Sequence, residues 1–310
     1  MTKQKIKIGT RESPLAMAQA EEVKMRLMNA HGLSDEQVEL CGMTTEGDQI
    51  LDRSFVDVGG KMLFTREIEK ALLDKKVDLA VHSFKDLETD MAEDFIIGAV
   101  LEREDPRDAF VSIDYKSFMD LPHGAKLGSA SLRRKAFALS LRPDLKVVLL
   151  RGNVGTRYRK LQEGQFDGTF MATAGLNRLG KSDYITEKME IDRMIPAPAQ
   201  GAIAVQIRSG DEEMQRLVGA IHCHKTGTCV DLERLFLFHL DGSCRTPIAA
   251  HAFFESEHQI HFRAKVLKPD GTGAFDFETK GSSVQLAHEI IEAALRIKVE
   301  AGPDFFKAEG

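Results

Sequence analysis

The segment Lys5-Ile-Lys-Ile-Gly-Thr-Arg-Glu-Ser-Pro14, near the start of the chain, predicts a strand that leads directly into a helix. Its first four residues favour a strand. Ser13 followed by Pro14 is typical of a helix N-terminus, because a serine hydroxyl caps the first turn and proline suits the first helical position. We expect this helix to reach about Asn29. Arg11 and Ser13 would then lie at the carboxyl end of the strand, where open α/β sheets bind ligands.

The same alternation of strand and helix continues along the chain and predicts two α/β units. In the first unit we expect strands at residues 38–43, 77–82 and 95–101 and a helix at 65–74. In the second we expect strands at 126–128, 146–150 and 168–172, with helices capped by Ser131 and Asn153. The charged segment 102–111 and the segment 196–201 are interpreted as crossings between the units. The strand expected at 202–207 would return to the first unit.

From about Thr226 the pattern changes to a helix at 230–240, strands near 248–254, 260–267 and 274–279, and a helix at 283–297. Successive strands joined by hairpins and packed on helices are typical of a small antiparallel α+β domain. The predicted fold is therefore α/β, with two α/β lobes and a C-terminal α+β domain that holds a three-stranded antiparallel sheet.

Composition argues against several classes of partner. A net charge of −6 over 310 residues gives no general attraction to nucleic acid or to an anionic membrane surface, and there is no tryptophan for base stacking. The first residues show no apolar signal-peptide core, and no apolar stretch approaches the length of a membrane span. We therefore expect a cytoplasmic protein without nucleic-acid or membrane partners.

Two arginine-rich loops concentrate positive charge in this acidic chain, at residues 127–134 and 150–157. Each follows an apolar run and precedes a predicted helix, so guanidinium groups and helix N-terminal N–H groups would face one anion. This pattern indicates a ligand with several carboxylates or phosphates, although separately solvated surface arginines remain an alternative. Neither loop has P-loop spacing, residues 175–180 are not a dinucleotide fingerprint, and His222-Cys-His224 has no partner cluster for a metal.

A third polar segment, His82-Ser-Phe-Lys-Asp86, ends a predicted strand. It falls at the same kind of strand end as Arg11, which favours a functional role, although a solvated Lys–Asp pair is the ordinary alternative. Among the four cysteines no CxxC spacing occurs, so we expect reduced thiols. Cys244 differs from Cys41, Cys223 and Cys229, because it lies in a glycine-containing loop beside Arg245, which favours the thiolate.

The chain resembles the porphobilinogen deaminases, also called hydroxymethylbilane synthases, over its whole length. Eight segments carry the resemblance, in the family order: 10–16 (TRESPLA), 59–64 (GGKMLF), 81–86 (VHSFKD), 102–109 (EREDPRDA), 131–134 (SLRR), 150–157 (LRGNVGTR), 199–202 (AQGA) and 242–244 (GSC). The resemblance implies three domains: residues 1–101 with 201–220, residues 105–197, and residues 224–310. The first two would resemble periplasmic-binding-protein lobes around a cleft, and the third would carry a cysteine.

The resemblance also implies a transferase of haem and porphyrin biosynthesis. A dipyrromethane cofactor, attached through a thioether to Cys244, would accept four porphobilinogen units head to tail with loss of ammonia, and water would release hydroxymethylbilane. Asp86 would be the catalytic carboxylate that stabilises the cations formed on the way. The cofactor and substrate carboxylates would be bound by cationic and hydroxyl side chains, with one aromatic beside the pyrroles: Arg11, Ser13, Phe64, Ser83, Lys85, Arg103, Ser129, Ser131, Arg133, Arg134, Arg151 and Arg157.

Some positions depart from the usual family pattern without removing the aspartate, the cysteine or an arginine of the expected site. They are Met62, Glu88, Ala130, Ala199 and the pair Arg245-Thr246. Residues 48–61 correspond to a mobile loop of the family. We expect an active monomeric enzyme, with a non-catalytic anion-binding protein as the competing hypothesis, because binding-protein lobes also occur without catalysis.

Overall fold

The computed structural model describes residues 5–45, 65–240, 246–302 and 305, and these form two compact units. The first unit contains described residues 5–45, 65–104 and 202–227. The second contains residues 105–201 and the described residues from 228 onward. Within the described ranges, no helix combines the length and the apolar character needed to cross a bilayer.

The first unit is built on a five-stranded sheet in the order β2-β1-β3-β10-β4. Strands β1 (Ile6–Arg11), β2 (Val38–Met43) and β3 (Leu79–Ser83) are parallel, with Ile6 opposite Val38. Strand β10 (Ile203–Arg208) inserts antiparallel between β3 and β4 (Phe95–Val100). The predicted return of the chain to this sheet is therefore confirmed.

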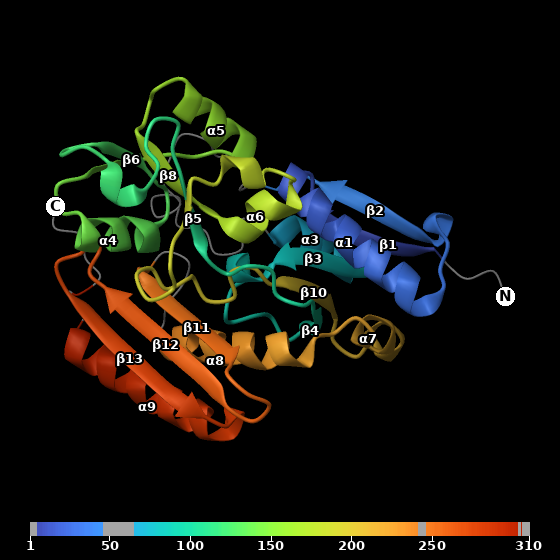
Figure 1. Cartoon of the computed structure of the whole chain (residues 1–310). Helices are drawn as coiled ribbons and strands as arrows, with labels where there is room; N and C mark the ends of the chain where they lie inside the picture. Colours follow the sequence, from blue (N-terminus) through green and yellow to red (C-terminus); the bar gives the residue numbers. More distant parts are fainter. Residues whose placement is uncertain (1–4, 46–64, 241–245, 303–304, 306–310) are drawn as a thin grey trace. The chain divides into compact units, whose positions relative to one another are not determined.

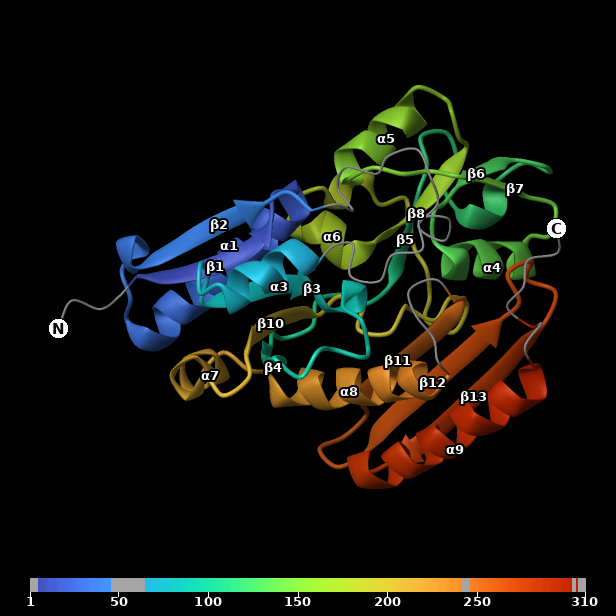
Figure 2. The same cartoon turned by 180° about the vertical axis from the view of Figure 1, so that it is seen from behind.

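Helices cover both faces of this sheet, which explains its apolar strands (Figures 1 and 2). α1 (Pro14–His31) and α7 (Glu212–Gly219) contribute Val23 and Val218 to the core on one face. α3 (Arg66–Leu73) contributes Ile68 and Leu72 to the core on the other. As predicted, Ser13 caps α1 by accepting a hydrogen bond from the Ala16 N–H at 3.3 Å.

The second unit contains a sheet of the same design, in the order β7-β6-β8-β5-β9. The three predicted strands are present as β6 (Lys126–Gly128), β7 (Lys146–Val148) and β8 (Gly168–Ala172), and they are parallel. Strand β5 (Asp108–Val111) pairs antiparallel with β8 and with β9 (Glu187–Lys188). The interpretation of 102–111 as a crossing throughout was wrong, because its last four residues form a fully buried strand.

Helices also cover both faces of the second sheet. α4 (Leu132–Leu141) packs Phe137 against one face, and α5 (Val154–Gln162) packs Leu161 against the other, where α6 (Thr173–Arg178) also lies. The predicted caps are confirmed, because Ser131 accepts from the Arg134 N–H at 3.4 Å and Asn153 from the Thr156 N–H at 2.9 Å. Both helices therefore begin directly after the expected loops.

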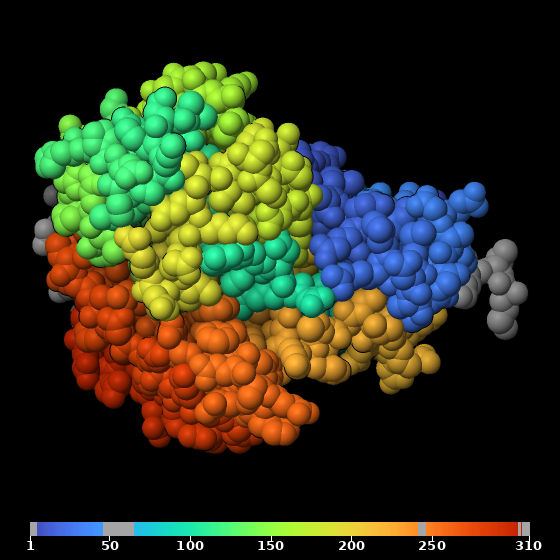
Figure 3. Space-filling model, in the orientation of Figure 1, coloured from blue at the N-terminus to red at the C-terminus, as the bar shows by residue number. Residues whose placement is uncertain are grey.

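The C-terminal part of the second unit is the predicted antiparallel sheet of β11 (Ile248–Phe254), β12 (Ile260–Leu267) and β13 (Ala274–Gly281). It packs on α8 (His224–His239) and α9 (Ser283–Ala301), with Phe236 and Ile290 in the shared core. In the space-filling view these residues, from orange to red, form a continuous surface (Figure 3). α8 begins six residues before the helix predicted at 230–240, and α9 ends four residues after the one predicted at 283–297.

Short elements complete the described chain. They are the 3-10 turns η1 (Asp35–Gln37), η2 (Phe84–Asp86), η3 (Phe118–Asp120) and η4 (Ser182–Tyr184). Of these, η2 matters most for the site, because it directly follows β3 and carries Lys85 and Asp86.

Candidate functional site

A polar pocket lies at the carboxyl ends of β1 and β3 in the first unit. Its cavity volume is about 70 Å³. Four residues that the sequence predicted for the site contribute to its wall: Arg11, Ser13, Ser83 and Asp86. The remaining lining residues are Leu15, Ala16, Gln19, Thr65, Val81 and His82. The structure thus gathers into one pocket two segments that lie about seventy residues apart in the sequence.

Local structure explains how each of these side chains reaches the pocket. Arg11 ends β1, and Ser13 is the cap of α1, so both follow from the strand–turn–helix signal in the sequence. Ser83 ends β3 and is held by Gln19 of α1, with side-chain distances of 2.9 and 3.0 Å. Asp86 is exposed on η2. An exposed carboxylate therefore faces solvent beside a cation and two hydroxyl groups.

Behind the pocket, His82 forms a hydrogen-bond chain that the sequence did not suggest. Its Nε2 lies 2.9 Å from Oε1 of Gln206, and Nε2 of Gln206 lies 2.9 Å from Oε1 of Glu69. All three side chains are buried. Burial lowers the pKa of His82 to about 4, with a smaller effect of the same sign from Arg11, while the Gln206 contact acts in the opposite direction. His82 is therefore neutral at physiological pH.

In the second unit the predicted arginine-rich loops lie at the N-termini of α4 and α5. Ser129 follows β6, and its hydroxyl accepts from the Ser131 N–H at 3.1 Å, which orders the loop before the cap. Arg151 is buried just ahead of α5, and Arg157, inside α5, donates from Nε to the Gly152 carbonyl at 2.8 Å. The loops therefore place cations and helix N-terminal N–H groups together, as the sequence predicted.

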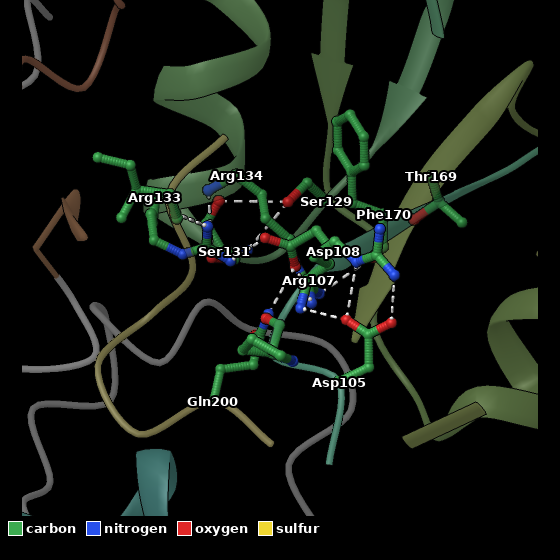
Figure 4. Close-up of polar contacts among 12 residues, drawn as sticks. Asp105, Arg107, Asp108, Ser129, Ser131, Arg133, Arg134, Thr169, Phe170 and Gln200 are labelled. Carbon is green, nitrogen blue, oxygen red and sulfur yellow. Dashed lines mark hydrogen bonds and ion pairs between the residues drawn. The ribbon is translucent and has the colours of Figure 1, made fainter. Parts of the chain in front are cut away.

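Arg133 and Arg134 differ from the expectation of ligand-facing side chains, because both are buried around Asp108 (Figure 4). Nη2 of Arg133 donates to Oδ2 of Asp108 at 2.7 Å, and Nε of Arg134 donates to Oδ1 at 2.9 Å. Each arginine also donates to a main-chain carbonyl, Arg133 to Ile195 at 2.8 Å and Arg134 to Phe170 at 3.0 Å. Both guanidinium groups are therefore fixed by the protein itself.

The electrostatics of this cluster favour the charged forms. Burial acts to raise the pKa of Asp108, but the neighbouring charges of Arg133 and Arg134 outweigh it and lower the pKa to about 2. For Arg133 burial outweighs the attraction of Asp108 and the pKa is lowered, yet a guanidinium remains protonated in proteins. Asp108 is therefore ionised and both arginines are protonated, so the cluster carries a net charge of +1.

Sequence reasoning missed the residues that organise this cluster. Asp108, which is fully buried, lies within the quoted segment 102–109, and its place beside an apolar run was the available signal. Gln200 donates from Nε2 to the Pro106 carbonyl at 2.8 Å and to Asp108 at 3.2 Å. Next to it, Arg107 holds Asp105 through two hydrogen bonds of 2.9 and 2.8 Å (Figure 4).

Two other predicted residues lie in the first unit but do not line its pocket. Arg103 follows β4, and its main-chain N–H donates to the Thr226 hydroxyl at 3.0 Å. Lys85 lies on η2, half-buried between Phe84 and Asp86. Phe64, Cys244 and the expected loop at 48–61 lie outside the described residues. The described cysteines, Cys41, Cys223 and Cys229, are free thiols. In the described ranges no group of metal-ligating side chains gathers.

Comparisons with known proteins agree with this organisation. Residues 6–216 match the family model described as porphobilinogen deaminase, dipyrromethane cofactor binding domain. Residues 227–296 match the model of the porphobilinogen deaminase C-terminal domain. A curated porphobilinogen deaminase from Nitrobacter hamburgensis is 48% identical over 299 residues, which cover 96% of this chain and 94% of that protein.

Two solved structures with a similar fold are periplasmic binding proteins at much lower identity. A periplasmic substrate-binding protein of an ABC transporter from Coxiella burnetii is 17% identical, with a TM-score of 0.45, covering 72% of this chain and 94% of that one. A periplasmic binding protein of Salmonella typhimurium with high arginine specificity is 14% identical, with a TM-score of 0.41, covering 70% and 91%.

The two family models match residues 6–216 and 227–296, and the Nitrobacter relative covers 96% of the chain, so all three comparisons name one family. The chain therefore belongs to the porphobilinogen deaminases, the enzymes that condense four porphobilinogen molecules head to tail on a dipyrromethane cofactor and release hydroxymethylbilane for tetrapyrrole biosynthesis.

Proposed function

We propose that Asp86 is the catalytic carboxylate of this enzyme and that Cys244 carries the cofactor. The observation that supports this most is the pocket in which Asp86 lies beside Arg11, Ser13 and Ser83. Porphobilinogen carries an acetate and a propionate as well as an aminomethyl group. Cationic and hydroxyl donors suit its carboxylates, whereas an anion suits the positive charge that develops when ammonia leaves.

The residues of the second unit fit a group with several carboxylates, such as the dipyrromethane. Nε of Arg133 and Nη2 of Arg134 are buried and form no hydrogen bond among the described residues, so both arginines of the Asp108 cluster keep a donor for a ligand. Ser129, Ser131, Arg151 and Arg157 surround the N-termini of α4 and α5, where anions bind favourably. We infer that these side chains, with Arg133 and Arg134, hold the cofactor carboxylates. When bound, the dipyrromethane supplies the free pyrrole position to which the first substrate unit is joined.

Arg11, Ser13 and Ser83 would orient the incoming substrate through its carboxylates, with Lys85 and Arg103 as further cations and Phe64 packing beside the pyrrole. Asp86 would then stabilise the cation formed by loss of ammonia and accept the proton released when the new carbon–carbon bond forms. Its exposure suits this role, because a carboxylate that exchanges protons repeatedly needs access to water.

The assignment is tested by intact mass and turnover of two variants. Cys244→Ala should show unmodified mass and no turnover, whereas Cys41→Ala, the matched control in β2, should keep its adduct. Asp86→Asn should keep the adduct and lose roughly 10²–10⁴ in rate, the usual effect of removing a positioned acid–base group. An adduct that survives in Cys244→Ala, or near wild-type turnover in Asp86→Asn, would refute the corresponding role.

We also propose that the enzyme acts as a cytoplasmic monomer with porphobilinogen as its small-molecule partner and without nucleic-acid or membrane partners. The net charge of −6 supports the absence of nucleic-acid and membrane partners, because an acidic protein is not attracted to nucleic acid or to an anionic membrane surface. The three-domain division at 1–101 with 201–220, 105–197 and 224–310 is part of the same proposal. Sedimentation of the purified enzyme tests the monomer, and limited proteolysis near residues 224–228 tests the third domain.

A further inference from the structure

His82, Gln206 and Glu69 come from three different elements, β3, β10 and α3, and form one chain of side-chain hydrogen bonds. His82 is 7% exposed and Gln206 is fully buried. His82 also lines the pocket that contains Asp86. The chain of hydrogen bonds therefore connects the wall of the pocket, at His82, with the Glu69 carboxylate of α3.

The chemistry of the three groups fixes the direction of every hydrogen bond in this chain. A carboxylate can only accept, so the NH₂ group of Gln206 must point towards Glu69. The carbonyl oxygen of the same amide then points towards His82 and can only accept as well. Nε2 of His82 must therefore carry the proton, which leaves Nδ1 with a free lone pair. Among the described residues, the only hydrogen bond of the His82 ring is the one at Nε2.

We propose that His82 uses Nδ1 as a neutral hydrogen-bond acceptor for an N–H group of the substrate in the pocket beside Asp86. This inference rests on the proposed role of the pocket and adds a second substrate-contacting residue to it. Porphobilinogen offers two such donors, the pyrrole N–H and the protonated aminomethyl group. A neutral imidazole suits either, because it accepts a hydrogen bond without adding positive charge next to Arg11 or to the cation that forms.

The tautomer is the first test and needs no substrate. In the holoenzyme with ¹⁵N-labelled histidine, the His82 ring should show the Nε2–H form at neutral pH. Its resonance can be assigned among the ten histidines by its loss in His82→Asn. Glu69→Gln removes the group that fixes the Gln206 amide, so this variant should show a mixture of both tautomers. A protonated Nδ1 in the wild-type enzyme would overturn the proposal.

The second test separates an acceptor in the pocket from a role in packing. The side-chain oxygen of asparagine can occupy the place of Nδ1, whereas the longer glutamine amide reaches the place of Nε2. If Nδ1 contacts substrate, His82→Asn should keep most of kcat/KM. His82→Gln should lose roughly tenfold, the effect of one missing hydrogen bond. The reverse order, with glutamine the better replacement, would mean that only the contact with Gln206 matters and would reject the proposal.

Controls keep the outcome interpretable. Intact mass should show a loaded cofactor in each variant, and thermal unfolding should show that each is folded. His31, whose Nε2 lies 2.9 Å from the Leu217 carbonyl, lies outside the pocket lining, so its asparagine and glutamine variants should not differ in kcat/KM. A substrate analogue with a methyl in place of the aminomethyl group, assayed as a competitive inhibitor, identifies the donor: the His82→Gln penalty on its inhibition constant disappears if the aminomethyl group is bound and persists if the pyrrole N–H is bound.

The Asp86 and His82 variants together distinguish an error about the pocket from an error about the His82 contact. Full turnover in Asp86→Asn would remove the pocket from the reaction, whatever the His82 variants show. Loss of turnover in Asp86→Asn, together with equal effects of asparagine and glutamine at position 82, would leave the pocket as the reaction site and remove only the contact with His82.

Discussion

In the first sheet the antiparallel strand β10 begins with Ile203 opposite Ser83, whereas in the second sheet the antiparallel strand β5 begins with Asp108 opposite Ala172. The two sheets otherwise match closely: three parallel strands, then an antiparallel strand, then a strand at the edge. Equivalent positions therefore hold an apolar residue in one unit and a buried carboxylate in the other. One backbone design supports two different interiors.

The polar groups near these positions differ in the same way. In the first unit the buried hydrogen-bond chain runs through a neutral histidine and an amide, and the exposed Asp86 remains open to solvent. In the second unit two guanidinium groups surround one carboxylate. The first arrangement suits a site where charge appears and disappears during a reaction. The second suits permanent binding of anions, because hydrogen bonds within the protein hold its cations in place.

The largest expected effect is on the charged cluster. Asp108→Asn would leave Arg133 and Arg134 buried without a counter-ion, and breaking a buried pair in this way costs about 3–5 kcal/mol of unfolding free energy. Urea unfolding measures the change. Asp276→Asn, which breaks the surface pair with Lys265 at 2.9 Å, is the matched control and should change stability far less. Equal losses in the two variants would mean that the interior of the second unit does not depend on this charge.

Acid should affect the two units in different pH ranges. His82 titrates near pH 4 in the folded protein, compared with 6.5 for an unperturbed histidine, because it is buried. Between these values the unfolded chain binds the proton and the folded chain does not, so lowering the pH through this range destabilises the fold by up to about 3 kcal/mol. Asp108 should contribute only below this range. Its pKa is lowered to about 2 from 3.8, so its stabilisation is lost between those values.

Urea unfolding at pH 7 and pH 4.5 measures the first of these effects. The loss in the wild-type protein should be clearly larger than the loss in His82→Gln, which lacks the titrating ring. If the two proteins lose stability in parallel, the buried histidine is not the acid-sensitive group of the first unit.

A smaller effect on stability is expected at the two serines that cap the helices after β1 and β6. Ser13 follows β1 and Ser131 follows β6 at corresponding places in the two strand orders, and each caps the next helix. Replacing either serine by alanine should cost about 1 kcal/mol of stability. Thermal unfolding of the two variants gives the comparison. A loss confined to one variant would show that the corresponding helix starts are not stabilised alike.

The smallest effect concerns the segment that leads into β10. Ala199 has a φ of 62°, a left-handed conformation that favours glycine, and its N–H donates to Glu233 at 2.6 Å. Ala199→Gly should therefore raise stability by at most about 1 kcal/mol. Gly164→Ala, at a φ of 70° on the surface of the second unit, is the reverse change and should lower stability. A destabilised Ala199→Gly variant would show that the lost methyl contacts outweigh the relieved strain.

Much of this fold was predictable from local signals. Strands such as Val38–Met43 and the serine caps depend on neighbouring residues, so a single segment was enough to predict them. β5 was missed because a charged segment precedes it, and the charges of Arg107 and Asp108 suggested solvent exposure. The start of α8 was missed because His224–Gly227 lacks an apolar periodicity.

The site was predictable in part, for a physical reason. Four of its residues follow strand ends: Arg11, Ser13, Ser83 and Asp86. The carboxyl ends of parallel strands lie along the same edge of a sheet, so residues that follow them come close together. The internal partners were not predictable in this way. Asp108 lies 25 residues from Arg133, and His82 lies 124 residues from Gln206, so only the completed fold brings them together. Burial of Arg133 and Arg134 is likewise a tertiary property, because the same two residues on an open loop would be solvated.

The insertion of β10 between β3 and β4 has a consequence for how the chain folds during synthesis. The strands of the second α/β sheet all lie between residues 108 and 188, so that sheet can form as soon as this stretch is complete. The first sheet cannot, since β4 has no neighbour in the sheet until residues 203–208 have been made. Contacts between segments this far apart in sequence form slowly. The pocket that contains Asp86 should therefore be among the later parts of the enzyme to assemble, and until then β3 and β4 present unpaired edges that could pair wrongly with other chains.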